Sequence, residues 1–116
     1  MDANELNEFR VLLESRLAEV KTSHDVHEET LKALKDRSDH ESGDLAQSLE
    51  NKEVEEQIVL NDEYYMEKIN KALLRIDAGT YGSCEGCCED IPMARLRAKP
   101  SVSLCIECQE KRDAGA

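Results

Sequence analysis

Two Cys-x-x-Cys pairs restrict the fold of this chain more than any other feature. The first pair is Cys84-Glu-Gly-Cys87, the second is Cys105-Ile-Glu-Cys108, and 17 residues separate Cys87 from Cys105. Two thiolates three positions apart on a tight turn can share one metal ion, and two such turns complete a tetrahedron. The spacing therefore predicts one Zn²⁺ held by four cysteines. Because four thiolates leave no open coordination position, this zinc is expected to be structural rather than catalytic.

Other uses of these cysteines stay open at this point, namely a thioredoxin-like redox pair or two disulfides. A redox pair belongs in a βαβ context, which the sequence does not predict. The segment 1–8 is acidic and polar, unlike a secretory signal, and no apolar run approaches the roughly 18 residues of a membrane span. We therefore expect a cytoplasmic chain without a membrane partner, in which thiols bind metal rather than form disulfides.

The fifth cysteine, Cys88, directly follows the first pair, at a position where glycine would ease a left-handed backbone. It is interpreted as a tolerated substitution, with a spare metal ligand and a redox-sensitive thiol as the alternatives.

Residues 1–78 contain no proline and predict two long helices. In the first, expected over about 5–37, apolar residues and histidines recur at spacings of three and four, which places them on one narrow stripe. At roughly 1.5 Å per residue this helix would be about 50 Å long. Polar turn formers occupy 36–43, and the second helix is expected over 45–78, with Gly79 just past its end. The stripe residues are Leu6, Leu13, Leu17, Val20, His24, His27, Leu31 and Leu34, then Leu45, Leu49, Ile58, Tyr65, Ile69, Leu73 and Ile76.

These elements predict a mainly α fold. Residues 1–78 would form a long antiparallel helical (coiled-coil) hairpin with its tip at about 37–45. Residues 79–116 would form a small four-cysteine zinc-finger module with a short C-terminal helix. A helical pair inside an oligomeric bundle is the alternative for the first part. Residues 95–99 fit either an extended segment or a turn of helix.

Charge and aromatic content exclude several functions. The chain has 26 acidic and 15 basic residues, a net charge of −11, and only 3% aromatic residues. A large apolar core and a substrate-burying enzyme pocket are therefore not expected. An acidic surface is repelled by phosphate backbones. Non-specific binding to nucleic acids or anionic membranes is therefore not the first expectation. Two functions are nevertheless kept as alternatives: a zinc-module nucleic-acid-binding protein that uses its basic residues, and a thiol/zinc redox-responsive adaptor. The basic residues concerned are Arg95, Arg97, Lys99, Lys111 and Arg112.

Three segments, GTYGSCEGC (79–87), IPMARLRAKP (91–100) and LCIECQ (104–109), together resemble the DksA/TraR family of bacterial transcription regulators. The preceding helices also match the DksA branch in their length back from the cysteines. The resemblance implies a non-enzymatic protein that binds RNA polymerase through its secondary channel and modulates transcription initiation, often together with ppGpp in the stringent response. It also implies no direct binding of a promoter sequence.

Site residues follow from the same resemblance. The acidic coiled-coil tip, which approaches the catalytic centre of the polymerase, falls on Glu41, Asp44 and Ala46. Asp44 and Ala46 match the family motif, whereas Glu41 replaces an aspartate. Candidate ppGpp or polymerase contacts fall on Lys68, Arg95 and Lys99, but Gln109 stands where the family carries a basic residue. Losing that cation would weaken binding of a polyphosphate.

Overall fold

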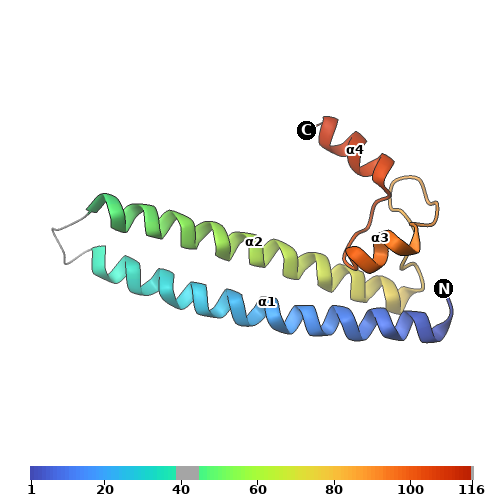
Figure 1. Cartoon of the computed structure of the whole chain (residues 1–116), viewed down its shortest axis with the longest axis horizontal. Coiled ribbons are helices and arrows are strands. Elements are labelled where there is room, and N and C mark those ends of the chain that lie inside the picture. The colour runs from blue at the N-terminus through green and yellow to red at the C-terminus, as the bar shows by residue number, and fades with distance from the viewer. Residues whose placement is uncertain (39–44, 116) are drawn as a thin grey trace. The chain divides into compact units, whose positions relative to one another are not determined.

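A computed structural model describes residues 1–38 and 45–115, with the side chains of 37–49 left undescribed. In the described part the chain forms the helices α1 (Ala3–Ser38), α2 (Leu45–Ala78), α3 (Met93–Ala98) and α4 (Ile106–Gly115), as Figure 1 shows. The mainly α fold is confirmed, and the predicted bounds of the two long helices are correct within two residues. The predicted tip residues Glu41 and Asp44 lie outside the described residues. Ala46 lies in the first turn of α2, but its side chain is outside them.

The chain groups into two compact units, one made of Met1–Leu17 with Lys68–Ala116, the other of Ala18–Glu67. Both long helices pass through both units. The division predicted between residues 78 and 79 is a different partition, and it stays a prediction.

In the unit Ala18–Glu67, parts of α1 and α2 lie antiparallel. Ser23 Oγ donates to Asp62 Oδ2 at 2.8 Å, and His27 Nδ1 lies 2.6 Å from Glu55 Oε2. Residues further along α1 thus meet residues further back along α2. Leu31 and Val59 supply buried apolar contacts. The predicted stripe contained Leu31 and His27 but not Val59.

The unit Met1–Leu17 with Lys68–Ala116 has a core drawn from both helices and from the segment that follows them. The Phe9 and Tyr81 rings pack with centroids 5.4 Å apart, and Arg10 donates to Asp77 at 2.6 Å. The helix ends and the cysteine-bearing segment therefore share one apolar core. Its buried residues are Phe9, Leu13, Ile69, Ala72, Ile76, Tyr81, Cys84, Ile91 and Leu96.

The end of α2 has the expected glycine cap. Gly79 has φ +76°, as the sequence predicted, and its N–H donates to Ile76 O at 3.2 Å. The N–H groups of Thr80 and Tyr81 both donate to Arg75 O. The carbonyls of Arg75 and Ile76, in the last turn of α2, thus accept hydrogen bonds from the residues that follow the helix. Among the described helices, none combines the length and apolarity that a membrane crossing requires.

Candidate metal centre

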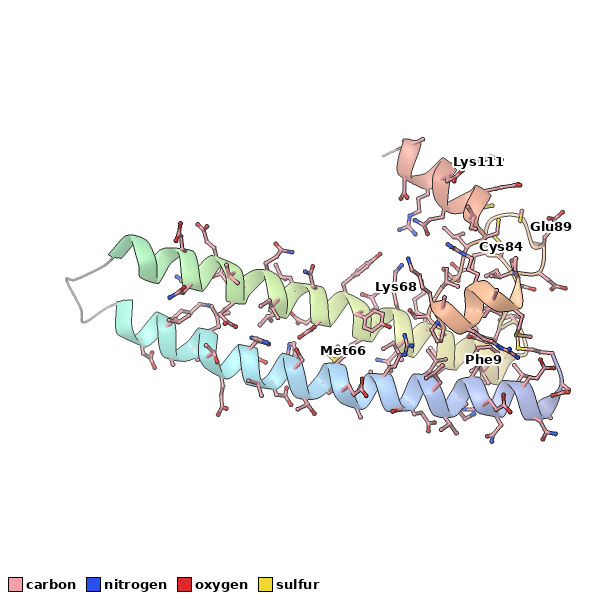
Figure 2. All side chains as sticks on the ribbon, in the orientation of Figure 1. Phe9, Met66, Lys68, Cys84, Glu89 and Lys111 are labelled. Carbon is pink, nitrogen blue, oxygen red and sulfur yellow. The ribbon has the colours of Figure 1, made fainter. Side chains whose placement is uncertain are left out.

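Two turns bring the four predicted cysteines together. Cys84, labelled in Figure 2, lies with Cys87 on the turn between α2 and α3. Cys105 directly precedes α4, and Cys108 lies in the first turn of α4. The four Sγ atoms lie within 4.8 Å of one another, and those of Cys87 and Cys105 are 3.8 Å apart. Sulfurs about 2.3 Å from a central zinc stand about 3.8 Å apart in a tetrahedron. The donor set and its spacing therefore fit one structural Zn²⁺, and no cysteine forms a disulfide.

Backbone hydrogen bonds shape the first turn. Cys84 N–H donates to Glu89 O at 2.8 Å, and Cys88 N–H donates back to Cys84 O at 3.0 Å. Gly86 lies where a Cβ atom would be 2.9 Å from Cys108 Sγ, closer than real Cβ contacts allow. Glycine at this position therefore lets the two cysteine turns approach one another.

The sulfurs have different protonation preferences. The N–H of Cys105 donates to Cys84 Sγ at 3.3 Å, and with further donation from the N–H groups of Cys87 and Gly86 it lowers the pKa of Cys84 to about 6. The neighbouring sulfurs, that of Cys105 first and that of Cys84 next, raise the pKa of Cys108 to about 12. Thiolates this close repel one another, and a bound dication would remove the conflict while releasing their protons. Cys84, Cys87, Cys105 and Cys108 would hold the zinc, which would cross-link the two turns.

The comparison with known proteins agrees with this geometry. Residues 79–114 match the family described as prokaryotic dksA/traR C4-type zinc finger. The segment 79–114 of this chain is therefore similar to the DksA/TraR zinc finger, with its four cysteines included.

Among DksA relatives, the RNA polymerase-binding transcription factor DksA of Caulobacter vibrioides is 44% identical over 46 residues, covering 40% of this chain and 32% of that protein. The protein of the same name from Haemophilus influenzae is 41% identical over 44 residues, covering 38% and 30%. The matched segment thus spans about a third of the length of these relatives.

Solved DksA structures extend the likeness beyond the zinc finger. Transcription factor DksA2 from Pseudomonas aeruginosa superposes with a TM-score of 0.83 at 28% identity, covering 97% of this chain and 86% of that one. The RNA polymerase binding protein and transcriptional regulator from Chlamydia trachomatis gives a TM-score of 0.63 at 20% identity, which shows a shared fold.

The remaining predicted residues lie around the centre in different settings. Cys88 is exposed, belongs to no metal-binding group in the described residues, and has φ +63°. The segment for which the sequence left two conformations open is the helix α3, so Arg95 is half-buried while Arg97 is exposed. Lys68 is half-buried on α2 and Lys99 is exposed just after α3. The role of Lys68, Arg95 and Lys99 as contacts stays a prediction.

Tyr81, Gly86 and Arg75 were not among the predicted site residues, although they lie in or beside the cysteine-bearing segment. Tyr81 is buried and its hydroxyl donates to Pro100 O at 2.8 Å. Burial raises the pKa of Tyr81 to about 12, against the opposing effect of the Arg75 charge. Gly86 could have been found as the small residue between two clustered cysteines. Arg75 carried no such signal, because a single arginine in a charged helix is unremarkable in sequence.

Proposed function

We propose that this chain is a bacterial transcription regulator that binds RNA polymerase through the secondary channel. The supporting observation is the likeness to transcription factor DksA2, which extends over 97% of this chain and 86% of that one. The relatives of the zinc-finger segment in Caulobacter and Haemophilus are named RNA polymerase-binding transcription factors, which supports RNA polymerase as the partner. The protein would act in the cytoplasm and perform no chemistry of its own.

The acidic segment between the long helices would be the part of the protein that changes transcription. Glu41 and Asp44 would approach the catalytic centre of the polymerase, where carboxylates can reorganise basic residues or Mg²⁺, and Ala46 would complete the motif. The net charge of −11 favours entry into a channel lined by cations and would speed docking. The zinc module would bind the polymerase at the rim of the secondary channel.

Alarmone binding would involve cations near the zinc module. Lys68 and Lys99 would contact ppGpp or the polymerase. Arg95 already donates through Nε to Leu104 O at 3.1 Å, so its contribution would come partly through the module itself. With Gln109 in place of a base, ppGpp is expected to enhance the effect on transcription rather than to be required for it.

The decisive experiment is co-purification of the zinc-loaded full chain with bacterial RNA polymerase, followed by transcription in vitro. We expect a stable complex and a changed lifetime of promoter complexes. Asp44→Asn should keep its affinity for polymerase but lose the effect on transcription. The matched control, Glu53→Gln, removes one exposed carboxylate elsewhere on α2 and should behave as wild type.

The outcomes separate the parts of the proposal. No complex with polymerase would overturn the function. A complex in which Asp44→Asn remains fully active would overturn the role of the tip alone. Lys68→Ala and Lys99→Ala should reduce the response to added ppGpp more than the response without it, and equal responses would remove the alarmone contacts.

A further inference from the structure

Two arginines from different helices hold the two cysteine pairs in the same way. Arg75 on α2 donates to the carbonyl of Ser83, and Arg95 on α3 donates to the carbonyl of Leu104. Ser83 is the residue directly before Cys84, and Leu104 is the residue directly before Cys105. In each cysteine pair, the carbonyl group of the residue directly before the first cysteine therefore accepts a hydrogen bond from one guanidinium group.

Arg75 is built into the first turn. Its side chain is 14% exposed, and Nη2 donates to both Thr80 O, at 2.9 Å, and Ser83 O. Its own carbonyl accepts the N–H groups of Thr80 and Tyr81. Backbone and side chain of one residue thus fix the whole path from the end of α2 to Cys84. Glu85 Oε1 lies 4.0 Å from Arg75 Nε, on the far side of that cysteine in sequence.

Arg95 has the corresponding place at the second turn. It is half-buried, and its Nε donates to Leu104 O at 3.1 Å. Beyond Leu104, Cys105 N–H points at Cys84 Sγ, 3.3 Å away, and Cys105 O accepts the N–H of Gln109 in α4. A shift of the peptide between Leu104 and Cys105 would therefore displace both the Cys105 sulfur and the Cys105 N–H group that donates to Cys84 Sγ.

We infer that Arg75 and Arg95 are positioning residues of the metal centre, each orienting one cysteine pair through the preceding carbonyl. The planar, permanently charged guanidinium suits this task better than a lysine does. Four thiolates around one Zn²⁺ leave a net negative charge, which two nearby cations would offset. Groups that orient metal ligands in this way commonly change metal affinity 10- to 100-fold when removed.

The test uses Arg75→Met and Arg95→Met in the full chain, since methionine keeps most of the length of the side chain without its donors. The matched controls are Lys71→Met, one turn earlier on α2, and Arg97→Met, two residues along α3, because both side chains are exposed. Zn²⁺ affinity is measured by chelator competition, and helix content by circular dichroism. We expect each arginine variant to bind Zn²⁺ about 10- to 100-fold more weakly than its control.

A second readout separates positioning from general destabilisation. With saturating Co²⁺ as the probe, a variant that is only less stable should give the wild-type thiolate–cobalt spectrum. The arginine variants should instead show shifted or weakened tetrahedral bands. Wild-type affinity, or weakened affinity with an unchanged cobalt spectrum, would overturn the inference. If a methionine variant loses its helix content, the leucine variant at that site, which also lacks donors, decides: an altered spectrum supports positioning, and a wild-type spectrum refutes it.

Discussion

Gly86 shows how single backbone positions decide whether the four sulfurs can meet. A Cβ atom there would lie 2.9 Å from Cys108 Sγ and 3.2 Å from Cys108 Cβ. Gly86→Ala should therefore push the two turns apart and weaken Zn²⁺ binding about tenfold or more in chelator competition. Gly115→Ala is the control, since that glycine has open space around it. Equal affinities of the two variants would contradict the prediction.

Cys88 carries backbone strain that glycine would relieve. Its φ of +63° lies in the left-handed region, which costs a residue with a Cβ atom. Cys88→Gly should raise the free energy of unfolding of the zinc-loaded protein by roughly 0.5–1 kcal/mol, after the added flexibility of the unfolded chain is counted. Cys88→Ser keeps the strain and should gain nothing in thermal unfolding. The prediction fails if the serine variant is as stable as the glycine variant.

Tyr81 links stability to pH at the alkaline end. Its pKa is raised to about 12 by burial, and the protonated hydroxyl donates to Pro100 O. Above about pH 10 the unfolded state ionises this tyrosine while the folded state keeps the proton, so stability falls as pH rises from about 10 to 12. Below that window both states are protonated and the group contributes no pH dependence.

Denaturant unfolding on either side of about pH 10 tests this expectation, with Tyr81→Phe as the matched variant. Both proteins keep their cysteines, so the difference in slope isolates the hydroxyl. The wild type should lose stability more steeply with pH than the phenylalanine variant. Parallel losses would show that other groups cause the dependence.

At the scale of single residues, the sequence predicted the four metal ligands but not the arginines that hold the peptides beside them. Cys84, Cys87, Cys105 and Cys108 were predictable because the spacing of metal ligands is local. The contact of Arg75 with Ser83 depends on how the chain leaves α2, and the contact of Arg95 with Leu104 depends on α3 being a helix. Hydrogen bonds to backbone carbonyls leave no pattern in side-chain chemistry.

Among the elements, helix bounds were more predictable than buried faces. Spacings of three and four predicted α1, and the turn formers over 36–43 with Gly79 predicted the bounds of α2. The buried residues Val59 and Ala72 were not in the predicted stripe. Phe9 was missed because its burial depends on Tyr81, far along the chain. The conformation of 95–99 could not be decided since alternating charges fit a strand and a short helix equally well.

The packing of α1 in the unit Ala18–Glu67 gives a prediction about helix pairing. Leu31 is 8% exposed, whereas Val26 on the same helix is 55% exposed. Leu31→Ala should lower the free energy of unfolding by about 2–3 kcal/mol, through lost burial and an unfilled cavity. Val26→Ala should change it by less than about 0.5 kcal/mol. Urea unfolding followed by far-ultraviolet circular dichroism provides the measurement, and similar costs at both sites would argue against this packing.

In the whole molecule, different interactions stabilise different segments. The unit Ala18–Glu67 relies on apolar contacts such as Leu31 with polar pairs such as His27–Glu55, none of which needs a metal. Residues 79–115 have few buried apolar side chains, and a module of this size generally needs a metal or a disulfide. Its five cysteines form no disulfide. Stability is therefore expected to depend on zinc in one segment and not in the other.

Metal removal tests this division directly. Because zinc binding to such sites contributes on the order of 10 kcal/mol, chelation should abolish hydrogen-exchange protection over 79–115. Tyr81 and Leu96 belong to the core that includes Phe9, so protection near the start of α1 should fall partly as well. Amides of 18–36 and 50–67 should exchange at the same rate before and after chelation. A uniform loss of protection along the chain would mean that the helix pair also depends on the metal.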